Sequence, residues 1–188
     1  MDTAYIFIAD GFEDIEALAT RDTLCRARIR VELVSINEDP FVVSSHGLAV
    51  GVDNFLDSIQ PDSSDVLIFP GGMPGSKNLA ACKPLIRMMK AHRAEGGKLA
   101  AICAAPGLVL SQLDGLEGVE MTCFDGFEDG LKAKGACFVR RPAVSSGGLI
   151  TARSAGYSIP FALEIVRALR GDAAVEATAG GLLLQVDS

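Results

Sequence analysis

A cysteine stands between two short apolar stretches of the chain. Residues 99–102, Leu-Ala-Ala-Ile, lead into Cys103, and Ala-Ala-Pro-Gly follows at 104–107. This order is typical of a buried strand that ends in a tight turn before a helix, with Pro106 in the first helical turn. A thiol at such a turn points out of the carboxyl end of a sheet, where open α/β folds bind ligands. The pattern predicts a nucleophile elbow, and the alternative is a small apolar residue in a core, since free cysteine is often buried.

A carboxyl group near the start of the chain is the candidate partner of this thiol. Glu13, Asp14 and Glu16 lie just past the first predicted strand, where the dipole of a new helix favours carboxylates. Glu16 follows Ile15 and should lie near the face that turns toward the sheet. A desolvated carboxyl group tends to stay protonated and can then donate a hydrogen bond to a thiolate. We therefore expect Glu16 to lower the pKa of Cys103 from the usual value of about 8.5.

A glycine-rich stretch ends another predicted strand at the same edge of the sheet. Residues 69–75 are Phe-Pro-Gly-Gly-Met-Pro-Gly. Glycines allow backbone N–H groups to approach a bound oxygen closely, as an oxyanion hole requires. The alternative is an ordinary strand-to-helix turn. The spacing is not G-x-G-x-x-G, so it gives little support to dinucleotide binding.

The chain contains two histidines, and neither follows the cysteine in sequence. They are His46 and His92. A Cys-His-Glu hydrolase or a glutamine amidotransferase needs a histidine downstream of its nucleophile, so both activities are disfavoured. His92 lies near a charged helix end, where we expect it to be solvated. His46 lies in a predicted turn and is either a surface group or a contributor across a subunit interface.

Apolar runs and helical spacing alternate along the chain. The predicted strands are residues 5–9, 31–36, 66–69, 99–102, 119–123, 137–144 and 149–152, with an extended excursion at 42–52. The predicted helices are residues 13–27, 78–82, 84–94 and 161–169. In the first helix Ile15, Leu18 and Ala19 share one apolar face. This alternation predicts one α/β domain over residues 1–188, doubly wound around a parallel sheet.

The composition limits the partners and the compartment. The chain has 188 residues, of which 49% are hydrophobic and 22% charged, so we expect a compact domain with only the last few residues loose. A net charge of −7 argues against nucleic-acid and anionic-membrane binding. Five cysteines form no C-x-x-C pair, so reduced thiols are expected and no zinc site or disulfide framework is indicated. Without a basic leader or a membrane-length apolar stretch, the expected location is the cytoplasm.

Four motifs in order resemble the ThiJ/PfpI superfamily over nearly the whole chain. They are Asp-Gly-Phe-Glu-Asp-Ile-Glu at 10–16, Phe-Pro-Gly-Gly at 69–72, Ala-Ala-Ile-Cys-Ala-Ala-Pro at 100–106 and Leu-Ile-Thr-Ala-Arg at 149–153. Any one of these motifs is weak, but the four together at these spacings are specific. The resemblance is to the branch that contains YajL and the human Parkinson-disease-associated protein deglycase.

The resemblance implies a flavodoxin-like sandwich with helices on both faces of a mostly parallel sheet, a homodimer and no cofactor. It also implies a reactive Cys103 hydrogen-bonded by a protonated Glu16, with the backbone amides of Gly72 and Ala104 completing an oxyanion site. The candidate pocket residues are Gly71, Arg153, Ala155 and His46. Members of this branch are associated with glutathione-independent glyoxalase activity, removal of early glycation adducts and a cysteine-based response to oxidants.

The chain also departs from the family pattern. Ala104 stands where the peptidase branch has a histidine, so peptidase activity is disfavoured. Ser-Ala-Gly-Tyr at 154–157 replaces a more usual Gly-Pro-Gly-Thr after the arginine, which changes the pocket wall. His46 lies where relatives often carry His or Arg near the dimer interface.

The motifs together predict a cysteine-dependent glyoxalase- or deglycase-type enzyme. Its substrates would be methylglyoxal-like dicarbonyls or their adducts with thiols and amines, with Cys103 as nucleophile and Glu16 moving protons. That chemistry needs no metal, nicotinamide or glutathione. The alternative is a non-enzymatic redox sensor or stress-protective, chaperone-like protein that uses the same thiol.

Overall fold

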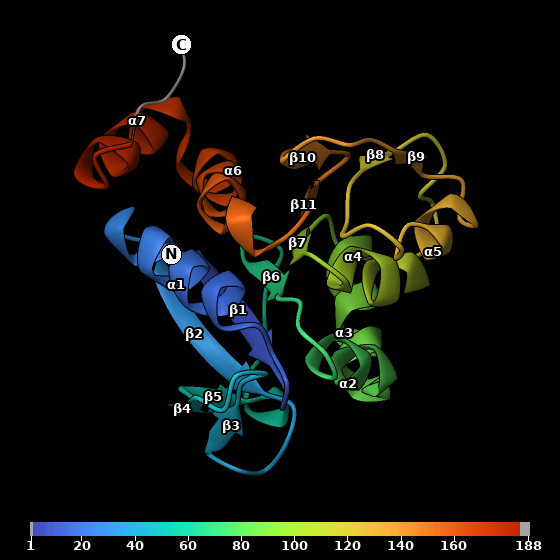
Figure 1. Ribbon diagram of the computed structural model, residues 1–188, viewed down its shortest axis with the longest axis horizontal. Coiled ribbons are helices and arrows are strands. Elements are labelled where there is room, and N and C mark those ends of the chain that lie inside the picture. The colour runs from blue at the N-terminus through green and yellow to red at the C-terminus, as the bar shows by residue number, and fades with distance from the viewer. Residues whose placement is uncertain (1, 185–188) are drawn as a thin grey trace.

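A seven-stranded sheet forms the centre of the computed structural model, which describes residues 2–184 (Figure 1). The strand order is β10-β11-β7-β6-β1-β2-β5, and β10 is antiparallel to β11 while every other pair is parallel. The strands are β1 (Thr3–Ile8), β2 (Arg30–Ser35), β5 (Asn54–Phe55), β6 (Val66–Phe69), β7 (Lys98–Ile102), β10 (Ala143–Ser146) and β11 (Leu149–Ala152). The expected loose end lies at residues outside the described part of the chain.

Helices cover both faces of this sheet, as Figure 1 shows. One face carries α1 (Asp14–Arg26), α6 (Ser158–Arg170) and α7 (Asp172–Gly181), with α6 packed between the other two. The other side carries α2 (Gly75–Ala81), α3 (Lys83–Ala94), α4 (Ala105–Leu108) and α5 (Asp129–Lys132). The predicted fold class, a mostly parallel sheet flanked by helices, is confirmed. None of the described helices is long and apolar enough to cross a membrane.

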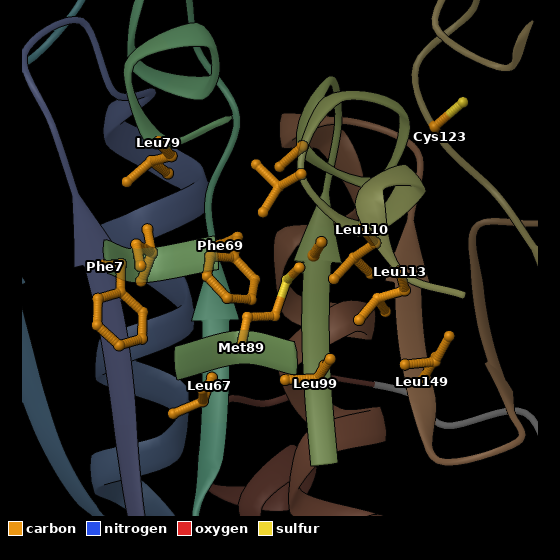
Figure 2. Close-up of a cluster of buried hydrophobic side chains, with 14 of the residues drawn as sticks. Phe7, Leu67, Phe69, Leu79, Met89, Leu99, Leu110, Leu113, Cys123 and Leu149 are labelled. Carbon is orange, nitrogen blue, oxygen red and sulfur yellow. The ribbon is translucent and has the colours of Figure 1, made fainter. Parts of the chain in front are cut away.

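Two apolar cores lie on the two faces of the sheet. Successive side chains of a strand point to opposite faces, so Ile6 and Ile8 enter one core and Phe7 enters the other. The second core, drawn in Figure 2, includes Phe69, whose ring stacks on Phe7 with centroids 5.5 Å apart. Strands buried on both faces contain nearly continuous apolar residues, which is why the sequence revealed them.

The first helix buries a different face from the predicted one. Ile15 is 55% exposed, whereas Ala17, Thr20 and Leu24 are buried. Helix α1 packs closely against α6, and a close helix contact favours small side chains such as Ala17 and Thr20 on the buried face of α1. Glu16 lies on the same buried face of α1, as its position in the sequence suggested.

The third quarter of the chain is less regular than predicted. The runs at 119–123 and 137–144 yield only β8 (Glu120–Met121) and β9 (Cys137–Phe138), paired in a separate two-stranded sheet. Strand β10 begins only at Ala143, because Pro142 before it cannot donate to a ladder.

The excursion at 42–52 forms a hairpin of β3 (Phe41–Val43) and β4 (Ala49–Gly51). Short 3₁₀ turns occupy Leu56–Ser58, Leu110–Gln112 and Ala155–Tyr157.

His92 is buried, and the expectation that it is solvated was wrong. Its ring fills the space over Gly97, where a Cβ would lie 2.2 Å from Nε2. A hydrogen bond of 3.2 Å joins Nε2 to the carbonyl oxygen of Lys98. Burial lowers the pKa of His92, so this imidazole is a neutral packing group.

Candidate active site

The cysteine of the predicted elbow adopts a strained backbone conformation. Cys103 follows β7 with a φ of 64°, a region that side chains other than glycine rarely occupy. Its N–H donates to the carbonyl oxygen of Ala152 at 3.0 Å, and its own carbonyl oxygen accepts from the N–H of Phe124 at 2.8 Å. These two bonds hold the turn from both sides. Strain of this kind clusters at functional sites, which agrees with the predicted elbow.

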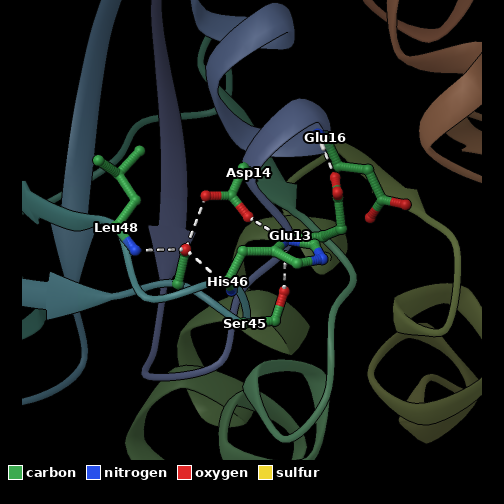
Figure 3. Close-up of polar contacts among 7 residues, drawn as sticks. Glu13, Asp14, Glu16, Ser45, His46 and Leu48 are labelled. Carbon is green, nitrogen blue, oxygen red and sulfur yellow. Dashed lines mark hydrogen bonds and ion pairs between the residues drawn. The ribbon is translucent and has the colours of Figure 1, made fainter.

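The carboxyl group of Glu16 reaches the thiol from the first turn of α1. It is 1% exposed and lies against the thiol of Cys103, since both groups would meet a Cβ built on Gly71. Its Oε2 accepts the N–H of Gly71 at 2.7 Å, and the nearby Ala155 amide also acts to lower its pKa. Figure 3 shows the Glu16 carboxyl pointing away from the polar cluster at the start of the helix. The predicted pair of Glu16 and Cys103 therefore exists as a direct contact.

The start of α1 is fixed by its own capping interactions. The side chain of Glu13 accepts the N–H of Glu16 at 2.8 Å, which satisfies one of the free amides of the first helical turn. The N–H of Glu13 in turn donates to the carbonyl oxygen of Gly71 at 3.0 Å. Because both Glu13 and Glu16 bind Gly71, the helix start is locked to the loop after β6.

Two backbone amides converge on the sulfur. The N–H groups of Gly72 and Ala104 lie near the Cys103 thiol and act to lower its pKa. Gly72 has a φ of 90°, a conformation that glycine adopts without strain. The structure thus brings together the residues that the sequence assigned to an oxyanion site, although their catalytic role remains a prediction.

The two titratable groups perturb each other. Burial raises the pKa of Glu16 to about 7, against the opposing effect of the Gly71 amide. Burial and the neighbouring Glu16 charge raise the pKa of Cys103 to about 12, although the Ala104 and Gly72 amides act to lower it. The expected depression of the thiol pKa was therefore wrong in direction, because an interior site disfavours a second negative charge. The pair keeps one shared proton over a wide pH range.

The remaining predicted pocket residues lie at different distances from the pair. Gly71 binds Glu16 directly, and the Ala155 amide lies near enough to lower the pKa of Glu16. Arg153 instead binds Asp125, to which its Nη2 donates at 2.6 Å. His46 is exposed, and its Nδ1 lies 2.6 Å from Asp14 at the start of α1 (Figure 3). This histidine contacts Asp14 and not the thiol, and a role beside a partner subunit remains a prediction.

One group of side chains in the described structure has the spacing of metal ligands. Ligand atoms of Glu13, Asp14 and His46 all lie within 4.8 Å of one another. Each already has a protein partner, since Glu13 caps α1 and Asp14 binds both His46 and the hydroxyl of Ser44. These bonds explain the cluster without an ion.

Sequence reasoning missed Asp125, the charged partner of Arg153, and Arg140, which binds the same carboxylate. Asp125 binds Arg153 and also accepts from Nη1 of Arg140 at 3.0 Å. A cleft of about 240 Å³ opens among Phe124, Asp125, Arg153, Ser154 and Tyr157. No local motif links these segments, because the turn after β8 and the segment after β9 meet Arg153 only in the folded chain.

Comparison with known proteins assigns the family. Residues 2–168 match the DJ-1/PfpI family, so the chain belongs to that family, as its four motifs indicated. Oxidized DJ-1 of Toxoplasma gondii has a similar structure, with a TM-score of 0.91 and 28% identity over 99% of this chain and 100% of that chain.

Two relatives with assigned names share about a third of their residues with the chain. Protein DJ-1 homolog B of Arabidopsis thaliana is 32% identical over 178 residues, covering 95% of this chain and 40% of that protein. The chain therefore spans less than half of that relative. Glutathione-independent glyoxalase DJR-1.2 of Caenorhabditis elegans is 31% identical over 159 residues, covering 85% of this chain and 83% of that protein.

Replacing Gly71 by alanine should disable the thiol. A Cβ at Gly71 would lie 2.4 Å from Oε2 of Glu16 and 2.5 Å from Cβ of Cys103, so the two groups must move apart. We expect alkylation of Cys103 by iodoacetamide, measured by mass spectrometry, to slow by about ten-fold or more. Gly156→Ala is the matched control, because a Cβ there meets nothing within 4 Å. Equal rates in wild type and Gly71→Ala would contradict the proposed contact.

The reactivity of the thiol should depend on pH through the carboxyl group. Below a pH near 7 both groups are protonated, and loss of the first proton lets Glu16 accept the thiol proton as sulfur attacks. Iodoacetamide alkylation of Cys103, followed from pH 5.5 to 9, should therefore rise with an inflection near pH 7. Glu16→Gln should remove that inflection. The same inflection in a folded Glu16→Gln protein would assign it to another group.

Proposed function

We propose that the protein is a cysteine-dependent enzyme of glyoxalase or deglycase type, with 2-oxoaldehydes such as methylglyoxal or their thiol and amine adducts as substrates. The observation that carries the proposal is the direct contact of the Cys103 thiol with a buried carboxyl group whose pKa is raised to about 7. Such a group can both accept and donate a proton at neutral pH. The similarity to a relative named a glyoxalase supports the same function.

The reaction begins with addition of the thiol to the aldehyde. Glu16 takes the thiol proton while Sγ of Cys103 bonds to the aldehyde carbon. The oxygen of that carbon becomes negative, and the N–H groups of Gly72 and Ala104 stabilise it before it gains a proton. The product of this step is a hemithioacetal that still carries the neighbouring ketone.

The second stage moves hydrogen within the substrate. Glu16 removes the proton from the former aldehyde carbon and returns one to the neighbouring carbon, while the proton of the hemithioacetal hydroxyl passes to the ketone oxygen, so that a thioester carbonyl and a new hydroxyl group form. The first carbon is oxidised and the second is reduced, so no external oxidant or reductant takes part. Water then hydrolyses the resulting thioester, which frees Cys103 and releases a 2-hydroxy acid.

Loss of the thiol should abolish turnover of methylglyoxal. In the absence of glutathione we expect wild type to consume methylglyoxal and form lactate, while Cys103→Ser loses at least about 10³-fold in kcat/KM because a hydroxyl is a far weaker nucleophile. Glu16→Gln should also lose most of its turnover, since the proton transfer has no carrier. Cys123→Ser is the matched control, because that cysteine is fully buried in a core.

Other outcomes of this experiment would redirect the proposal. Full turnover by Cys103→Ser would exclude the thiol mechanism. If neither folded protein turned over methylglyoxal or its adducts, the same thiol would be a candidate oxidant sensor. That second function requires mild peroxide to modify Cys103 while Cys25, Cys82, Cys123 and Cys137 stay reduced.

We also propose a homodimer in the cytoplasm as the working form. Apolar side chains are exposed along the start of α1 and the adjoining β3–β4 hairpin, namely Ile15, Phe41, Val43 and Leu48. The hairpin lies against α1, because Ser44 and His46 both bind Asp14. A second copy of the chain is the occupant we assign to this surface, and the five free cysteines support a reducing compartment.

Light scattering tests the homodimer directly. We expect twice the chain mass of 19.7 kDa at micromolar concentration. Phe41→Glu should shift the mass toward that of one chain, because it places a charge within the apolar surface. A wild-type mass of one chain would overturn the dimer and leave the thiol chemistry unaffected.

A further inference from the structure

The carboxylate that lines the cleft is bound by two guanidinium groups, of which Arg153 lines the cleft and Arg140 lies outside its lining. Arg153 binds Asp125 through one oxygen, and Arg140 binds it through both at 3.0 Å. Two guanidinium groups thus share one carboxylate, which leaves a local charge of about +1. This excess is unusual in a chain whose net charge is −7.

The backbone segments on both sides of the cleft are hydrogen-bonded to the backbone of Cys103. Phe124 donates its N–H to the carbonyl oxygen of Cys103, and the N–H of Cys103 donates to Ala152, the residue before Arg153. On the far side of Arg153 the chain reaches Ala155, whose amide acts to lower the pKa of Glu16. The cleft and the reaction centre are therefore built on the same backbone segments.

The arginine at the inner wall is suited to an anionic ligand. The Arg153 side chain is 23% exposed, compared with 60% for Arg140, so its charge is less screened by water. A guanidinium group has five N–H donors, and the bond to Asp125 uses one from Nη2, which leaves donors for a second carboxylate or a phosphate. Phe124 and Tyr157 add apolar walls on which a short carbon chain can pack.

We infer that this cleft binds a negatively charged end of the substrate. The preferred substrates are then 2-oxoaldehydes, or their adducts, that carry a carboxylate or phosphate two or three carbons from the reacting carbonyl. This inference rests on the proposed function, and it names Arg153 as a residue that determines specificity. Methylglyoxal, which has only a methyl group at that end, is accepted but leaves the cleft unfilled.

A pair of matched aldehydes tests the inference. In 4,5-dioxopentanoate a carboxylate replaces the terminal methyl group of 2-oxopentanal, and both are 2-oxoaldehydes. We expect kcat/KM to be at least about ten-fold higher for the anionic substrate, mainly through a lower KM. Arg153→Gln should bring the ratio of the two kcat/KM values close to one, whereas Asp125→Asn should raise it by removing the competing carboxylate.

A neighbouring arginine gives the control for overall charge. Arg141 is ion-paired with Glu120 and does not line the cleft, so Arg141→Gln should leave the ratio of the two substrates unchanged. Equal kcat/KM for both aldehydes in wild type would overturn the inference while upholding the proposed function. An equal fall of the ratio in Arg141→Gln and Arg153→Gln would also overturn it, because overall charge would then explain the preference.

A binding measurement keeps the inference testable if neither aldehyde is turned over. In that case the proposed function fails, and protection of Cys103 from iodoacetamide is measured with 2-hydroxyglutarate and 2-hydroxypentanoate. The dianion should protect at a concentration at least about five-fold lower, and Arg153→Gln should abolish the difference. Equal protection by the two acids would show that the cleft does not recognise the second negative charge.

Discussion

The burial of a carboxyl group against a thiol is the constraint on which the rest of the site depends. Raising the pKa of Glu16 from 4.5 to about 7 makes its ionisation less favourable by about 3 kcal/mol. Since the folded protein holds this proton more tightly than the unfolded chain, stability falls as pH rises through that window. Such a cost is tolerated only where the surroundings fix the group. Here the amide of Gly71 does so through its hydrogen bond to Oε2.

The topology of the sheet explains how distant segments meet at this pair. From β1 the chain moves to β2 on one side and later to β6 and β7 on the other, so the strand order reverses direction between β1 and β6. Ligands of open α/β folds bind at such a switch point, outside the carboxyl ends of the strands. The segments that follow β1, β6 and β7 supply Glu16, Gly71 and Cys103, and each lies at this edge.

The sequence predicted those features that depend on local order along the chain. Apolar runs located the central strands, and small residues around Cys103 located the elbow. Properties set by packing were predicted less well, because a pattern within one element does not show what lies against it. The exposed Ile15 and the buried His92 are two such cases. The direction of the Cys103 pKa shift is another, since it depends on how deeply the sulfur and Glu16 are buried together.

A shared proton distinguishes this site from one that simply holds a thiolate. A permanent thiolate would favour reaction with any oxidant, whereas a thiol whose pKa is raised must transfer its proton to Glu16 before the sulfur can react. That requirement favours substrates that present a carbonyl carbon to the sulfur and an oxygen to the Gly72 and Ala104 amides at the same moment. It also gives Glu16 the proton that the later steps on the substrate require. The raised thiol pKa therefore makes the reactivity of the sulfur depend on proton transfer to Glu16.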